Sequence, residues 1–469
     1  MEPSWSATET ARAVRRREVS PVEVLEATLA RVDALNPSLN AVVWRNDEQA
    51  RADARKLADV VAQGLEELPP LAGVPVPVKD LTEVAGWPVT FGSLQAPEGL
   101  SDEDELVVAR LRRAGCVLTG RTNTPEFGPI TAAENLRYGI SRNPWDTGRT
   151  PGGSSGGAAA AVASGMVPMA HANDGGGSIR IPASCCGLVG LKPSRGRVPQ
   201  LTAVWLGASV EGVLTRTVLD TATALDLVSG NDPLFWFQAP PPDRPFVEEV
   251  GADPGSLRIA LVTRAPLGLP VDEAPRAAAE HAGALLESLG HRVERLDIEL
   301  FPDEAIEPFV ALVNAGLGDY THYGIDFSQA EPHIAAAHRQ ATQTSAVDLV
   351  HHLGQLQRIS RAAAGRFGRD FDLLVTPTMA IEPPEAGRIL AASHANPEGP
   401  VLEVLAMAAF TAPFNVSGQP AVSVPLWWSD QGLPIGVQVV GGPFQEAVLL
   451  RVAAQLEQAE PWAGRWPPG

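Results

Sequence analysis

The sequence Gly152-Gly153-Ser154-Ser155-Gly156-Gly157 begins the stretch that decides the fold, and it leads directly into an alanine-rich run at 158–163. Alanine is the strongest helix former and Gly165 follows the run, so the pattern predicts a helix that ends there. Farther along, Asp174-Gly175-Gly176-Gly177-Ser178 places three glycines before a serine. Successive glycines let backbone N–H groups approach a substrate oxygen closely, as an oxyanion hole requires. Ser178 is therefore the candidate nucleophile.

The glycine-rich turn at 152–157 has two other interpretations. A phosphate-binding loop would need a Gly-Lys-Ser/Thr ending or dinucleotide-binding spacing, and the turn has neither. The nucleophile turn of an α/β-hydrolase esterase has the pattern Gly-x-Ser-x-Gly, which fits at both Ser154 and Ser155. That turn follows an apolar strand, whereas the residues at 143–151 are polar and proline-containing. The esterase interpretation stays open as an alternative.

A serine nucleophile needs a base, and the chain offers two candidates. His171 is near in sequence, but a histidine in such an apolar run is more often a packed core residue. Only three of the 36 basic residues are lysines, and Lys79 directly follows the apolar run at 74–78. Burial lowers a lysine pKa, whereas arginine does not deprotonate in proteins. Lys79 is the preferred base; an ion pair with a carboxylate is the alternative.

Alternating helical and strand patterns predict an α/β fold. Ser20-Pro21 begins a helix with an N-cap serine and a proline in the first turn, and Asn36-Pro37 is expected to end it. Further helices are expected at 48–61, 105–114, 277–289 and 447–456, and strands at 74–78, 116–119, 421–426 and 435–440.

Composition narrows the function classes. The formal charge of −19 argues against a nucleic-acid partner, because such binding depends on clustered lysine and arginine. Cys116, Cys185 and Cys186 form no disulfide pattern, which favours a reducing cytoplasm. No apolar run approaches the length of a membrane span and the N-terminus lacks a signal-peptide pattern, so neither a membrane nor secretion is expected. No cofactor or metal is expected.

Several motifs together resemble the amidase signature family. They are Lys79, the serine–glycine turn at 152–157, Gly-Gly-Ser-Ile-Arg-Ile-Pro-Ala at 176–183, and the segments 123–127, 143–145, 187–193 and 434–438. The resemblance spans nearly the whole chain and is weaker from about 200 to 400. It implies one domain over 1–469 with a large mixed β-sheet flanked by helices on both faces. Its expected parts are a catalytic core at about 65–215, a substrate-shaping segment at about 230–400 and a C-terminal return at about 401–469.

The resemblance also implies roles for individual residues. The family's Ser-cisSer-Lys triad maps onto Ser178 as nucleophile, Ser154 as bridging serine after a cis peptide bond, and Lys79 as base. The other expected site residues are Gly175, Gly176 and Gly177 in the oxyanion hole, Ser155 in support, and Asp174 with Arg180 as a structural pair. Many members have threonine where this chain has Gly175, which puts the rigidity of the oxyanion loop in question.

The implied function is hydrolysis of carbon–nitrogen bonds in amides, with esters and carbamates as further substrates. The alternative from another class is a glutaminase subunit of a tRNA-dependent amidotransferase. A small-molecule amide or carbamate is the expected partner, and a homodimer is the candidate assembly. Trp205, Phe235, Trp236 and Phe237 are candidates for an apolar pocket, with core packing as the alternative.

Overall fold

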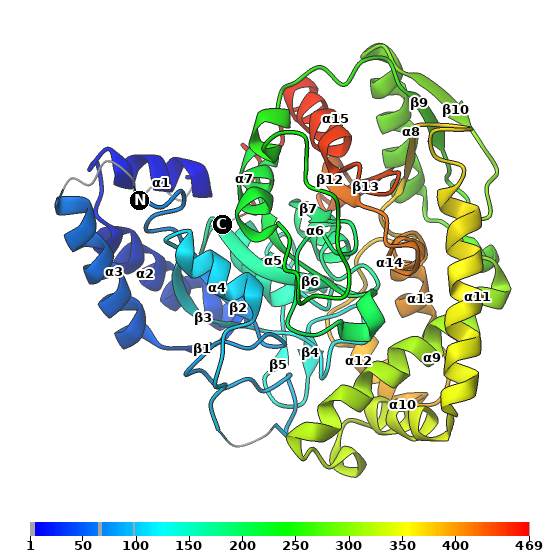
Figure 1. The fold of residues 1–469 in the computed structure, drawn as a ribbon, viewed down its shortest axis with the longest axis horizontal. Helices are drawn as coiled ribbons and strands as arrows, with labels where there is room; N and C mark the ends of the chain where they lie inside the picture. The colour runs from blue at the N-terminus through cyan, green and yellow to red at the C-terminus, as the bar shows by residue number, and fades with distance from the viewer. Residues whose placement is uncertain (1–4, 64–67, 97–98, 469) are drawn as a thin grey trace.

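The computed structural model describes residues 5–63, 68–96 and 99–468, and a mixed sheet of eight strands lies at its centre (Figure 1). β9, β10 and β11 run parallel, and the other neighbours pair antiparallel. In sheet order the strands are β10 (Arg292–Arg295), β9 (Arg258–Leu261), β11 (Leu373–Pro377), β13 (Pro434–Gly441), β12 (Ala421–Trp428), β7 (Val189–Lys192), β8 (Val210–Thr215) and β6 (Met169–Asp174). The predicted α/β class with a large mixed sheet is confirmed.

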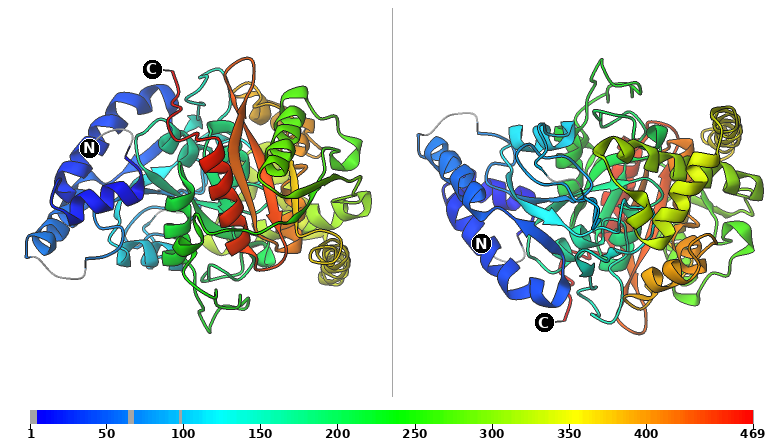
Figure 2. Two further views of the ribbon diagram at one scale, coloured as in Figure 1. Left: turned by 90° about the horizontal axis from the view of Figure 1, so that it is seen from above. Right: turned by 90° about the horizontal axis from the view of Figure 1, so that it is seen from below.

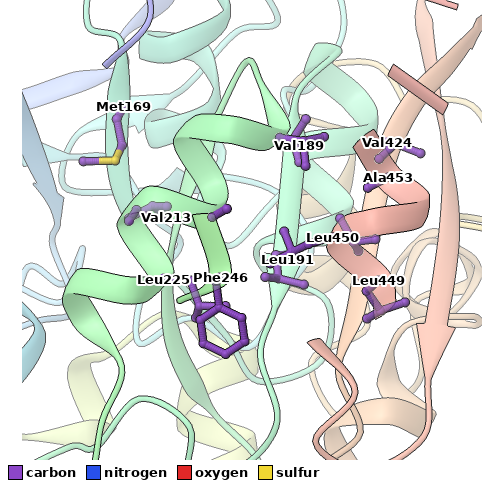
Figure 3. Packing of buried hydrophobic residues seen from close by; sticks show 14 of the residues in the cluster. Met169, Val189, Leu191, Val213, Leu225, Phe246, Val424, Leu449, Leu450 and Ala453 are labelled. Carbon is purple, nitrogen blue, oxygen red and sulfur yellow. The ribbon is translucent and has the colours of Figure 1, made fainter. Parts of the chain in front are cut away.

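Helices cover both faces of this sheet, as neighbouring residues of β8 show. Successive strand residues point to opposite faces. Val213 belongs to a core cluster that includes Leu225 and Leu449 from helices on one face, whereas Leu214 belongs to a cluster with the alanines 158–163 on the other. Figure 3 shows Leu225 and Leu449 with the strand residues of the first cluster.

The helices fall close to the positions that the sequence predicts. The expected runs at 48–61, 105–114, 277–289 and 447–456 correspond to α3, α4, α8 and α15, and the alanine-rich run lies in α5. The helices are α1 (Ala7–Arg15), α2 (Pro21–Leu39), α3 (Asp47–Ala62), α4 (Leu106–Arg113), α5 (Gly156–Ala163), α6 (Arg180–Cys186), α7 (Val218–Val228), α8 (Glu273–Ser288), α9 (Ile306–Gly316), α10 (Pro332–Gln343), α11 (Ala346–Ala364), α12 (Arg388–Ala395), α13 (Leu402–Ala408), α14 (Ala412–Ser417) and α15 (Glu446–Ala459). Figure 2 shows α1 to α3, in blue, at one end of the molecule and α11 at the other.

The predicted end of the first long helix is wrong. α2 begins as expected, with Ser20 and Glu23 in a capping box, but it continues through Pro37 to Leu39. A proline in the last turn removes only its own N–H donor, and the Asn40 N–H still donates to the Asn36 carbonyl. Asn40 then ends the helix in the left-handed conformation, with a φ of 48°.

A second, three-stranded sheet carries Lys79. Its order is β1 (Val42–Arg45), β3 (Val117–Thr122) and β2 (Pro75–Lys79), so β2 lies at an edge. An edge position suits a strand with two prolines, which cannot donate to a ladder. Pro77 lies where the register with β3 shifts, between Val76 and Val78. The predicted strand before Lys79 is therefore confirmed.

A short pair, β4 (Glu134–Asn135) and β5 (Gly139–Ile140), completes the strands of the described residues. Within the same described ranges, no helix is both long and apolar enough to cross a membrane.

Candidate active site

Three side chains from separate segments form a continuous hydrogen-bonded line. Lys79 ends β2, Ser154 lies just before α5, and Ser178 lies in the loop between β6 and α6. The Lys79 Nζ donates to the Ser154 Oγ at 2.7 Å, and the Ser154 Oγ donates to the Ser178 Oγ at 2.9 Å. The peptide bond between Gly153 and Ser154 is cis. This line gives a proton a path between the Ser178 hydroxyl and the lysine amine.

Lys79 lies in an environment that favours its neutral form. The side chain is fully buried, and burial lowers its pKa to about 7 although Glu211 and Asp174 act in the opposite direction. Besides Ser154, its Nζ donates to Asn173 Oδ1 at 2.6 Å. Among the described residues it forms no ion pair with a carboxylate, so the ion-pair alternative does not fit. Near neutral pH a large share of Lys79 can accept a proton.

His171 does not contact Ser178. It is fully buried in β6, where its Nδ1 accepts the Lys79 backbone N–H at 3.3 Å and its Nε2 lies 2.7 Å from Glu211 Oε2. With Nδ1 as acceptor, a neutral ring carries its proton on Nε2 and donates to Glu211. Both ring nitrogens are therefore engaged away from Ser178, and the ring positions the backbone of Lys79.

Three backbone N–H groups of the oxyanion loop are free to bind a substrate oxygen, but the set contains Ser178 in place of the predicted Gly177. The Gly177 N–H donates to Asp174 Oδ1 at 2.8 Å, so the prediction that it faces the substrate oxygen is wrong for this geometry. Within the described chain, the N–H groups of Gly175, Gly176 and Ser178 donate to no protein acceptor. These three groups are the donors that an oxyanion could use.

Asp174 and Arg180 form a fully buried ion pair behind this loop. Arg180 donates to both carboxylate oxygens, at 3.0 Å and 2.8 Å, and also to Gln438, Asn415 and the Thr411 carbonyl. Burial alone would raise the pKa of Asp174, but Arg180, together with Lys192 and Asn415, outweighs it and holds that pKa well below its usual range. Because Asp174 also accepts N–H groups of the loop, the pair fixes the loop beneath Ser178.

Ser155 occupies a supporting position. It is the N-cap residue of α5, and its Oγ donates to the backbone carbonyl of Asn173 at 3.2 Å. The side chain of Asn173 in turn accepts from Lys79. Ser155 therefore holds the strand residue that orients the lysine.

A cavity of about 740 Å³ leads to Ser178. Its aromatic lining residues are Phe91, Phe127, Trp205, Phe235, Trp236, Tyr320 and Tyr323. Its acidic lining residues are Glu83, Glu103, Glu105 and Glu211, and none of the described lining residues is lysine or arginine. A second cavity, of about 540 Å³ beside α11 and α14, contains none of the site residues.

The aromatic prediction holds for three of its four residues. Trp205, Phe235 and Trp236 line the cavity, with Trp236 at its exposed rim. Phe237 does not: its ring packs beside Gly207, and the Arg195 guanidinium lies 5.6 Å from the ring centre. Phe235 and Trp236 therefore line the pocket, whereas the adjacent Phe237 packs locally.

Trp205 accounts for the unusual glycine in the oxyanion loop. A Cβ atom at position 175 would lie 2.7 Å from Cζ3 of the Trp205 ring, and a Cβ at Gly316 on the other side would also clash with it. The indole therefore occupies the space that a threonine at 175 would need. Gly175 makes room for a pocket wall, and Trp205 limits the movement of the loop at that point.

Sequence reasoning missed Asn173 and Glu211. Asn173 and His171 are two residues apart in β6, so they share a face, and both contact Lys79. The alternation along 169–174 could have indicated this face. Glu211 lies opposite Asn173 in the β6–β8 register, and its side chain reaches His171 from there. No local sequence pattern indicates this contact.

The esterase alternative does not fit the structure. Residues 141–155 form turns and irregular backbone, so no strand leads into the turn. The Ser154 Oγ is engaged with Lys79 and Ser178. Ser154 therefore lies between two partners, whereas an α/β-hydrolase nucleophile stands exposed at a strand–helix turn.

Comparisons with known proteins identify the family of the chain. A family profile described as Amidase matches residues 23–450. The chain is 39% identical to the 6-aminohexanoate-cyclic-dimer hydrolase of Paenarthrobacter ureafaciens, over 98% of this chain and 96% of that protein. A solved structure of 6-aminohexanoate cyclic dimer hydrolase complexed with substrate matches at a TM-score of 0.92 and 38% identity, over 100% of this chain and 99% of that one. The structure of a bacterial aryl acylamidase matches at a TM-score of 0.88 and 29% identity, over 98% of this chain and 99% of that one.

These matches place the chain among the amidases, a class of hydrolases. More specifically, the chain belongs to the amidase signature family, as its sequence motifs predict.

Proposed function

We propose that the protein hydrolyses carbon–nitrogen bonds with Ser178 as nucleophile, Ser154 as proton relay and Lys79 as base. The observation that supports this most directly is the line of hydrogen bonds from Lys79 Nζ through Ser154 Oγ to Ser178 Oγ, at 2.7 and 2.9 Å. The line ends at a cavity of about 740 Å³, a volume typical of small-molecule sites.

In the proposed mechanism, neutral Lys79 accepts the Ser154 proton while Ser154 accepts the Ser178 proton. Ser178 then attacks the substrate carbonyl carbon, and the N–H groups of Gly175, Gly176 and Ser178 stabilise the oxyanion. Protonated Lys79 returns the proton through Ser154 to the leaving amine, so that the carbon–nitrogen bond breaks and an acyl-enzyme remains. A water molecule repeats the sequence and releases the acid.

The pocket supports a substrate with an apolar body and no negative charge. Seven aromatic side chains can pack against an aliphatic or aryl chain. Of the four acidic side chains, Glu105 has a pKa raised to about 7 and is partly neutral near that pH, while the other three, with no lining lysine or arginine among the described residues, repel an anion. The similarity to 6-aminohexanoate-cyclic-dimer hydrolase supports testing cyclic and linear aliphatic oligoamides first. Aryl amides, esters and carbamates of matched size present the same carbonyl and belong in the same proposal.

The test is a screen of purified protein against amides, esters and carbamates with matched acyl groups. We expect Ser178→Ala to abolish turnover of every cleaved substrate, and unchanged turnover would refute the nucleophile. Ser154→Ala should slow amides more than esters, because an amine leaving group must be protonated. A pair of amides that differ only in a terminal ammonium or carboxylate group tests the pocket charge, with about tenfold higher kcat/KM expected for the cation.

The glutaminase alternative predicts a different result. Such a subunit would release ammonia from glutamine and act within a complex. Turnover of p-nitroanilides by the isolated chain, with none on glutamine, would decide for a hydrolase that acts alone.

A further inference from the structure

A second cluster of chemistry-bearing side chains joins α10 to α12, which lie side by side (Figure 1). It consists of Glu331 and His333 at the start of α10 and His394 near the end of α12. Glu331 Oε2 lies 3.2 Å from His394 Nε2 and 3.8 Å from His333 Nδ1, and one ligand atom of each residue lies within 4.8 Å of the others. None of the three lines the amidase pocket.

The spacing of these atoms is close to that of a tetrahedral metal site. A zinc ion with bonds of about 2.1 Å to nitrogen and oxygen separates neighbouring ligand atoms by about 3.4 Å. The observed 3.2 and 3.8 Å bracket that value, and the ligand nitrogens of His333 and His394 lie within 4.8 Å of each other, so side-chain rotations that bring the two rings closer would complete the geometry. Two imidazoles and one carboxylate are ligands that zinc commonly takes with a water molecule in the fourth position.

His333 is a buried histidine without a hydrogen-bond partner. Its side chain is 9% exposed, and within the described residues neither ring nitrogen forms a hydrogen bond. A buried polar group without a partner costs about 1–3 kcal/mol, and a metal bond would satisfy one nitrogen.

A second buried carboxylate lies beside the cluster, because the Glu331 N–H donates to Glu126 Oε2 at 2.7 Å. Within the described residues, neither Glu126 nor Glu331 forms an ion pair with lysine or arginine. A divalent cation at the cluster would therefore not have to displace such an ion pair.

We propose that Glu331, His333 and His394 form a binding site for a divalent first-row transition metal, with zinc as the expected ion. The two imidazole ligands favour such ions over calcium or magnesium, which prefer oxygen ligands alone. The ion would fasten α10 to α12. It would also steady the pocket wall, because the Glu331 N–H donates to Glu126, the residue next to Phe127.

The test uses the full-length chain without an affinity tag, stripped with a chelator and then titrated with Zn²⁺ and, separately, with Co²⁺. We expect one equivalent of Zn²⁺ per chain, visible Co²⁺ absorption bands of tetrahedral nitrogen–oxygen coordination, and a rise in Tm of about 2 °C or more with Zn²⁺. His333→Gln and His394→Gln should each weaken binding at least about 100-fold. His338→Gln is the matched control, because His338 lies on the same helix but stacks on Phe327.

Each outcome decides the proposal. His394 is 25% exposed and lies on the other helix, so His394→Gln gives an answer even if His333→Gln does not fold. Absence of stoichiometric binding by the wild-type chain, or binding of equal strength in His394→Gln, would overturn the site. Because the readouts are binding, absorption and Tm, they do not depend on amidase activity.

Discussion

Replacing Glu211 with glutamine should move the acid limb of the pH–rate profile to lower pH. The proposed base must be neutral, so kcat/KM should rise with pH through the Lys79 pKa of about 7. The negative charge of Glu211 raises that pKa, and its removal should lower it. The Lys79 Nζ contacts the side chain of Asn173, and Asn173 lies opposite Glu211 in the β6–β8 register. At roughly 8 Å and an effective dielectric constant of about 20, one charge contributes about 2 kcal/mol, so a shift of about 1.5 pH units is expected.

The assay is kcat/KM for a neutral amide between pH 5 and 9, with each profile scaled to its own plateau. At pH 6 the wild type should keep about a tenth of its plateau and Glu211→Gln about three quarters, because a base with a pKa of about 5.5 is about three-quarters neutral there. Glutamine can still accept the His171 Nε2–H, so the ring should keep its place.

Glu105→Gln is the control for this experiment. Glu105 lines the same pocket and burial raises its pKa to about 7, so it titrates in the same range. It does not contribute to the pKa shift of Lys79. The acid limb of the pH–rate profile should lie at the same pH in Glu105→Gln as in the wild type. A limb that moves there, or one that stays fixed in Glu211→Gln, would refute the assignment of Lys79 as the titrating base.

Three further predictions concern stability and packing. Lys79→Met should abolish hydrolysis yet raise the free energy of unfolding at pH 6.5, measured with urea. Lowering the Lys79 pKa from 10.5 to about 7 destabilises the folded protein by about 5 kcal/mol below pH 7. The methionine leaves the former partners of the amine unsatisfied, which reduces the net gain to about 2 kcal/mol. That gain should shrink by pH 9.5, since the cost disappears as pH rises toward 10.5. Gly175→Ala should lower kcat through the Trp205 clash, and Trp205→Ala in the same chain should restore part of it; equal loss in the double variant would contradict this contact. Arg180→Lys should destabilise the fold by about 3 kcal/mol or more in thermal unfolding, because lysine cannot bond both oxygens of buried Asp174.

The sequence predicts best where local chemistry is sufficient. The helix after the glycine-rich turn follows from its alanines, and the strand before Lys79 follows from its β-branched residues. The ion pair of Asp174 with Arg180 is also local, since both flank one loop. In these cases the residues that cause the structure are neighbours in the chain.

Prediction fails where partners come from distant segments. The pairing of His171 with Glu211 depends on the β6–β8 register, and the metal-binding cluster depends on how α10 meets α12. Trp205, which lies against Gly175, adopts a positive φ of 49°, which is uncommon for a bulky residue and which the sequence does not indicate. Each of these contacts needs tertiary packing that composition and periodicity do not specify.

The scarcity of lysine illustrates the difference between predicting burial and predicting a role. Of the three lysines, Lys79 and Lys192 are both fully buried, and burial lowers both pKa values. Among the described residues, Lys192 donates only to the Pro193 carbonyl, which cannot carry a proton onward. Lys79 donates to a hydroxyl that itself donates to a second hydroxyl at the pocket. A lowered pKa makes either lysine able to accept a proton, but only the serine beside Lys79 connects that ability to a nucleophile.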